Sequence, residues 1–82
     1  MLSTEREIRQ EYRGAWQEKL AERLRRGNVE DVRAEARNGL HYVVAQWRNS
    51  EGQPRLDEYA YFSKPQLAEE AVRVVKRLAT LN

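Results

Sequence analysis

Two runs of β-branched and aromatic residues, separated by a polar connector, mark the middle of this chain. The first run is LHYVVAQW at 40–47, the second is RLDEYAYF at 55–62, and NSEGQP at 49–54 lies between them. Strand-forming runs bounded by turn-forming residues are the pattern of a β-hairpin. We therefore expect strands at 41–47 and 56–62, joined by an exposed connector.

Regular alternation along these strands would divide their side chains between two faces of the hairpin. The face expected to pack against helices contains Val43, Ala45, Trp47, Leu56, Ala60 and Phe62. The opposite face contains Tyr42, Val44, Gln46, Asp57, Tyr59 and Tyr61. Tyrosine is enriched at the centres of protein interfaces, so this second face is a candidate contact surface unless the first helix covers it.

Charged stretches with helical spacing of apolar residues flank the hairpin. The residues Ile8, Tyr12, Trp16, Leu20 and Leu24 predict a helix over 4–26, capped by a hydroxyl residue at position 3 or 4. Their period of four makes the apolar stripe drift around the helix, so one flat surface cannot cover all of it.

Two further helices are expected, one on each side of the hairpin. Val29, Val32 and Ala36 predict a short helix over 29–37, which Asn38-Gly39 would end. The last helix is expected to start at Ser63, which forms a capping box with the glutamine three residues later, and to run to about residue 81.

The region 29–48 also supports a second interpretation. Its apolar residues keep helical spacing throughout, which would make one long helix and an all-α bundle of three or four helices. Against this stand Asn38-Gly39 in the middle and the aromatic run at 59–62, which needs a strand partner. The favoured expectation is a single α+β domain over 1–82, in the order helix, helix, strand, strand, helix.

Composition restricts the classes of function. The chain has 82 residues, of which 40% are hydrophobic and 34% charged, so its core is small and much of its surface is polar. It contains no cysteine and no apolar run long enough to span a membrane. We expect a cytoplasmic protein that does not enter a membrane.

No residue pattern predicts catalysis, a cofactor or a metal site. His41 is the only histidine, and no second histidine, cysteine or carboxylate stands at ligand spacing from it. The serines have cap or turn explanations, and there is no glycine-rich phosphate loop. We expect a protein that is not an enzyme and that has no catalytic, cofactor-binding or metal-binding residues.

Basic residues suggest an alternative function. The net charge is +2 and the isoelectric point is about 9.2, but acids and bases are interleaved. Arginine and lysine clusters stand where helices are expected to end, which is explained by the helix dipole as well as by a binding patch. The residues that would contact nucleic acid are Arg23, Arg25, Arg26, Arg33, Arg37, Arg73, Lys76 and Arg77.

Two known nucleic-acid-binding patterns do not fit the expected elements. A double-stranded-RNA-binding domain would require a third strand and a lysine cluster at the start of the last helix. A helix-turn-helix over 29–48 would present a mainly apolar recognition helix, LHYVVAQWR, to the groove.

The sequence therefore favours a small regulator, inhibitor or adaptor that binds a protein without catalysis. Its partner would be another protein or a second copy of the chain, reached through a hairpin edge and exposed aromatic surface. The candidate contact residues are Tyr42, Val44, Tyr59, Tyr61, Trp16 and Leu24.

Overall fold

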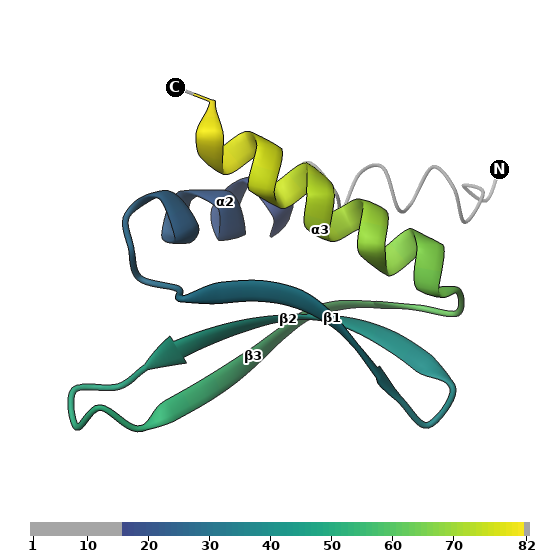
Figure 1. Ribbon diagram of the computed structural model, residues 1–82, viewed down its shortest axis with the longest axis horizontal. Helices are drawn as coiled ribbons and strands as arrows, with labels where there is room; N and C mark the ends of the chain where they lie inside the picture. The colour runs from purple at the N-terminus through teal and green to yellow at the C-terminus, as the bar shows by residue number, and fades with distance from the viewer. Residues whose placement is uncertain (1–15, 82) are drawn as a thin grey trace, which may run out of the picture.

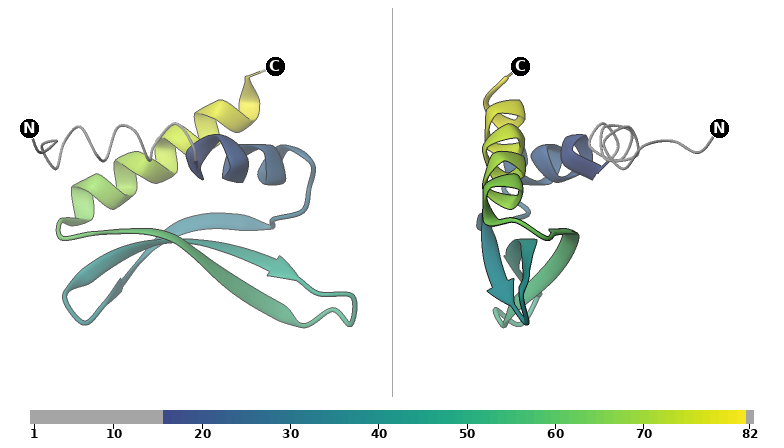
Figure 2. Two further views of the ribbon diagram at one scale, coloured as in Figure 1. Left: turned by 180° about the vertical axis from the view of Figure 1, so that it is seen from behind. Right: turned by 90° about the vertical axis from the view of Figure 1, so that its right-hand side faces the viewer.

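The computed structural model describes residues 16–81 and has two helices and three strands in this range. In chain order the elements are α2 (Glu18–Arg25), β1 (Asp31–Arg37), β2 (Leu40–Arg48), β3 (Pro54–Phe62) and α3 (Pro65–Thr80). The strands form one antiparallel sheet in the order β1-β2-β3, so β2 is central. Both helices lie on the same side of the sheet, with α3 running diagonally across it (Figures 1 and 2).

The α+β class and the hairpin are confirmed, and the all-α alternative is excluded. β2 and β3 occupy the two runs that predicted strands, and the loop between them lies within the expected connector. The first expected helix is described only from residue 16 onward. Its predicted cap and its residues Ile8 and Tyr12 lie outside the described residues.

The helix expected over 29–37 was wrong, because Asp31–Arg37 forms the strand β1. This segment, DVRAEAR, alternates small apolar and charged residues, which suits a sheet edge with one face on a core. Asn38 and Gly39 have φ angles of 51° and 79°, the geometry of a two-residue hairpin turn, whereas a helix stop was expected there. The pairing energy of the sheet overrides the helix propensity of alanine, arginine and glutamate.

A bulge in β3 makes the division of its side chains between the two faces different from the expected one. The register shifts between Val43 and Val44, so that Val43 lies opposite Ala60 while Val44 lies opposite Glu58. The extra residue is Tyr59. Before the bulge the alternation is reversed, so Leu56 pairs with outward-facing Gln46 and Asp57 pairs with inward-facing Ala45.

The core lies between the sheet and the two helices. Its buried members are Leu20, Ala21, Val29, Val32, Val43, Ala45, Ala68, Ala71 and Val75. Trp16, Leu24, Tyr59 and Phe62 pack around its margin. Alanines on α3 allow the helix to approach the sheet closely, which explains a compact core built from few large side chains.

The start of the last helix differs from the expected capping box. Lys64 is the N-cap residue and makes no side-chain hydrogen bond there, and Pro65 occupies the first turn. Ser63 therefore does not cap this helix. Proline at the first turn still fits, because its missing N–H would have no intrahelical partner.

Candidate functional site: the outer face of the sheet

The sheet has one face that no described element covers, which we call the outer face. It consists of the side chains that point away from α2 and α3, and Figure 2 shows the helices confined to the opposite side. Its principal residues are Asp31, Arg33, Glu35 and Arg37 of β1, Tyr42, Val44 and Gln46 of β2, and Leu56, Glu58 and Tyr61 of β3.

Val44 forms the centre of the outer face. Its exposed fraction is 0%, although it belongs to the face opposite the core. Its cross-strand neighbours are Arg33 and Glu58, whose long side chains stand on either side of it. The outer face is therefore packed around a buried valine, and this packing holds its polar side chains in place.

Two tyrosines form an aromatic pair on the outer face. Tyr42 and Tyr61 are cross-strand partners, and their ring centroids lie 6.0 Å apart at an interplanar angle of 44°. The guanidinium of Arg37 lies 5.5 Å from the centroid of the Tyr42 ring. Tyr61, near the end of β3, is 67% exposed, and Leu56, near its start, is 45% exposed. Both ends of β3 therefore present apolar surface to solvent.

A ladder of ion pairs runs along β1 and reaches β3. Arg33 binds Asp31 through Nη1 at 3.2 Å and Glu35 through Nη2 at 2.8 Å. Arg37 binds Glu35 at 2.9 Å, and it also pairs with Glu58 across the central strand. Arg33 additionally donates a hydrogen bond to the Gln46 Oε1 atom at 3.0 Å.

These contacts shift the pKa values of the ladder. The hydrogen bond from Arg37, aided by Arg33, lowers the pKa of Glu35 although partial burial opposes this. Hydrogen bonds to Asp31 and Glu35 raise the pKa of Arg33, and hydrogen bonds to Glu35 and Glu58 raise that of Arg37. The outer face thus keeps fixed charges of both signs at neutral pH.

The six residues proposed as protein contacts do not lie on one surface in the structure. Tyr42, Val44 and Tyr61 belong to the outer face, where Val44 is covered by its neighbours. Tyr59 turns toward the helices, where its ring lies 6.3 Å from that of Trp16 and its hydroxyl accepts a hydrogen bond from Arg23. Trp16 and Leu24 pack against the core, so neither is an exposed anchor.

The basic residues proposed as nucleic-acid contacts do not converge on one surface. Arg33 and Arg37 lie in the ladder of the outer face, whereas the others lie on the helical side. Arg25 donates to the carbonyl oxygens of Leu78 and Ala79, and Arg26 pairs with Glu22. Arg73, Lys76 and Arg77 are exposed on α3 and have no ion-pair partner within residues 16–81.

Arg23 holds α2 against β3. Its Nη1 atom lies 3.0 Å from the Asp57 carboxylate and also donates to the Tyr59 hydroxyl. Burial lowers the pKa of Arg23, but the hydrogen bonds to Asp57 and Tyr59 raise it by more. Asp57 faces Arg23 only because the bulge reverses the alternation of β3, so sequence alternation alone misassigned this contact.

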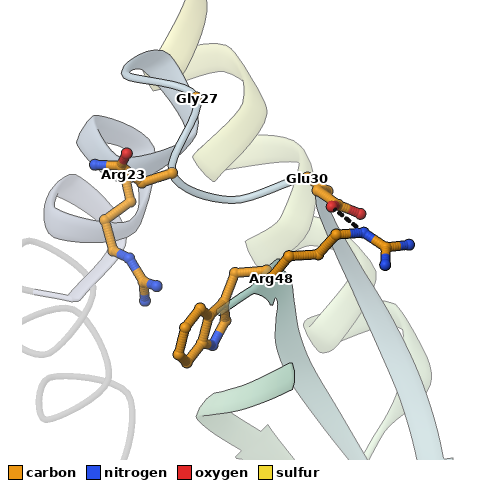
Figure 3. A pocket seen from close by; sticks show the side chains of 6 residues that line it. Arg23, Gly27, Glu30 and Arg48 are labelled. Atoms are coloured by element: carbon orange, nitrogen blue, oxygen red, sulfur yellow. Dashed lines mark ion pairs between the residues drawn. The ribbon is translucent and has the colours of Figure 1, made fainter. Parts of the chain in front are cut away.

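A shallow polar hollow lies beside Arg23, where the turn after α2 meets the end of β2. Figure 3 shows the Arg23 side chain on one wall and Arg48, paired with Glu30 at 2.7 Å, on the other. Its volume is about 460 Å³, and Gly27, Asn28 and Trp47 complete its lining. Its guanidinium groups already bind Asp57 and Glu30, so it has little uncompensated charge with which to select a ligand.

The described residues offer no basis for a metal or a membrane-spanning helix. Within 16–81 there is no group of three histidine, cysteine, aspartate or glutamate residues that could hold a metal ion. None of the helices in this range has the length and apolar character needed to cross a membrane. The sequence matches no protein-family model, and comparisons with curated proteins and with solved structures found no match.

The fold bears on the two nucleic-acid-binding patterns that the sequence did not fit. A helix-turn-helix over 29–48 is ruled out, because this segment is a β-hairpin. The third strand that was missing for a double-stranded-RNA-binding domain is present as β1. However, α3 opens with one lysine, Lys64, followed by Glu69 and Glu70, so the cluster that would contact phosphates is still missing.

Proposed function

We propose that this protein is a small non-enzymatic binding domain whose outer face contacts a partner protein. In this role it would act as a regulator, inhibitor or adaptor. The observation that carries the proposal is the exposed Tyr61 beside Tyr42, on a sheet face that no described element covers. Absence of cysteine fits the reducing cytoplasm as its location.

The charge of the outer face favours a protein partner over a polyanion. Arg33 and Arg37 are balanced on the same face by Asp31, Glu35 and Glu58. With two bases and three acids, this surface has no excess of positive charge to attract phosphates over a distance, but it can match a partner with complementary charges at the rim. Tyrosine and arginine are also the residue types enriched where protein interfaces are fully buried.

The proposal is tested by affinity capture with matched surface variants. The Tyr61→Asp variant places a charge in the exposed aromatic pair, whereas the control Lys76→Asp changes a charge on α3, on the opposite side of the molecule. A partner retained by the wild type and by Lys76→Asp, but lost by Tyr61→Asp, would then be purified and its affinity measured by calorimetry. We expect Tyr61→Asp to weaken binding by about 2 kcal/mol or more.

Circular dichroism must show that both variants fold like the wild type before capture is compared. A partner that binds all three proteins equally would place its contact elsewhere on the molecule. A partner lost with Lys76→Asp alone would point to the helical side and contradict the proposal.

Single-stranded nucleic acid is a second candidate for the same face. The observation that favours it is the tyrosine pair on neighbouring strands of an open antiparallel sheet, since such aromatics can stack on unpaired bases. Binding of single-stranded RNA or DNA, measured by fluorescence anisotropy, should then fall about tenfold or more between 50 and 200 mM salt. It should also be lost with Tyr61→Ser. Equal binding by Tyr61→Ser would exclude stacking at this site.

A further inference from the structure

The open edge of β1 has a charge pattern that is complementary to itself. Along Asp31–Arg37 the outer-face side chains are Asp31, Arg33, Glu35 and Arg37, which alternate in sign. Among residues 16–81, β1 pairs only with β2, so the other edge of this strand presents unpaired backbone groups. If a second β1 strand runs antiparallel to the first, with the two copies of Ala34 opposite each other, every acid faces a base.

The register of the hairpin determines which backbone groups point to this edge. Arg37 and Leu40 close the two-residue turn, so they form a hydrogen-bonded pair, and the odd-numbered residues of β1 then bond to β2. The Glu30 N–H also donates to the Gln46 carbonyl oxygen, so this carbonyl points toward β1, as it does in a hydrogen-bonded Asp31–Gln46 pair. The N–H and C=O groups of Val32, Ala34 and Ala36 therefore point outward.

We propose that two copies of this chain associate through β1 into one continuous six-stranded sheet. The two-fold axis passes between the two copies of Ala34. In this register, the outward backbone groups of Val32, Ala34 and Ala36 exchange about six hydrogen bonds between the copies. The proposal concerns the edge of the sheet and does not depend on what binds the outer face.

The same register aligns the charged side chains. Arg33 lies opposite Glu35 of the second copy, and Asp31 lies opposite Arg37 of the second copy. These positions are non-hydrogen-bonded pairs, in which opposing side chains approach most closely. Among the even-numbered residues, Ala34 lies at the axis and Ala36 lies opposite Val32 of the second copy, so small side chains leave room for the second strand on the helical side.

Charged residues on edge strands often prevent association, but this ladder lacks the features that do so. Protection relies on like charges, prolines, bulges or charges pointing into the core side. β3 has two of these devices, Pro54 at its start and the bulge at Tyr59. β1 has no proline, and its outer-face charges attract those of an antiparallel copy.

Complementary charge reversals test the register. In Arg33→Glu, position 33 repels Glu35 of the second copy, and in Glu35→Arg, position 35 repels Arg33 of the second copy. Each variant alone should self-associate at least about tenfold more weakly than the wild type. Mixed in equal amounts, the two variants should form a heterodimer of near wild-type affinity, because both cross-strand pairs become attractive again.

Sedimentation velocity over about 10 μM to 1 mM chain measures these affinities, and native mass spectrometry identifies the heterodimer. Circular dichroism shows whether each variant is folded. A wild type that stays monomeric over this range would overturn the proposal. So would single variants that dimerise as well as the wild type, or a folded mixture that forms no heterodimer.

A proline substitution tests the backbone contact separately. Ala34→Pro removes an N–H that points to the open edge, so the monomer should remain folded while dimerisation is lost. The control Glu35→Pro removes an N–H bonded to β2 and should disrupt the sheet. A folded Ala34→Pro variant that still dimerises would place the interface away from β1. A failure of outer-face binding leaves these results unchanged, so the two proposals are judged separately.

Discussion

Gln17 is a polar residue inside the described core. It is 2% exposed, and its Nε2 atom is buried without a hydrogen-bond partner among residues 16–81. It stands at helical spacing from Leu20, Ala21 and Leu24, the residues by which α2 packs against the core. An amide donor in this position costs free energy that an apolar side chain of similar size would not.

We therefore expect Gln17→Leu to stabilise the protein. The gain in the free energy of unfolding should be about 1 kcal/mol, which corresponds to a rise in Tm of about 4–8 °C for a domain of this size. The matched control is Gln66→Leu, because Gln66 is exposed on the first turn of α3 and should change Tm little. Thermal denaturation followed by circular dichroism makes the comparison. A lower Tm for Gln17→Leu would mean that the amide has a stabilising role.

At the scale of elements, the sequence predicted β3 and α3 from patterns with a single interpretation, and it predicted β2 because the aromatic run of β3 needs a strand partner. The run from Leu67 to Leu78 has helical periodicity, and the aromatic residues at the end of β3 strongly favour a strand. Residues 29–37 fit both the helical spacing of apolar residues and the alternation of a strand. Only their pairing with β2 decides in favour of the strand. The bulge at Tyr59 has no local signal of its own, so alternation misassigned Leu56 and Asp57.

The ladder of β1 makes a pH-dependent contribution to stability. Because the pKa of Glu35 is lowered in the folded protein, its ion pairs stabilise the fold above the pKa of the unfolded chain. This contribution is lost as pH falls through the folded pKa. We expect Glu35→Gln to reduce the free energy of unfolding by about 0.5–1 kcal/mol at pH 7, and we expect this deficit to shrink as the pH falls through the folded pKa of Glu35.

Chemical denaturation at several pH values measures this difference. Glu51→Gln is the control, because Glu51 lies in the loop between β2 and β3 and has no ion pair within the described residues. It should match the wild type throughout. A deficit of Glu35→Gln that is as large at pH 3 as at pH 7 would mean that packing, and not charge, explains the role of Glu35.

At the scale of the whole molecule, the sequence could not show how its arginines are distributed. Neighbours along α2 have different partners, because successive residues of a helix point about 100° apart. Arg23 reaches β3, Arg25 reaches the end of α3, and Arg26 pairs within α2. Clusters in the sequence thus become separate structural contacts, and the candidate surface consists of residues far apart along the chain.

The contact of Arg25 with α3 gives the last prediction. Arg25 donates from Nη2 to the Leu78 carbonyl oxygen at 2.9 Å, at the C-terminal end of α3, where the helix dipole favours a cation. Arg25→Met should lower the free energy of unfolding by about 1 kcal/mol and speed amide hydrogen exchange in the last turn of α3. The control Arg26→Met removes only an exposed pair with Glu22 and should cost about 0.5 kcal/mol or less. Equal exchange rates in the two variants would show that α2 does not hold the end of α3, and that the helices depend on the shared core alone.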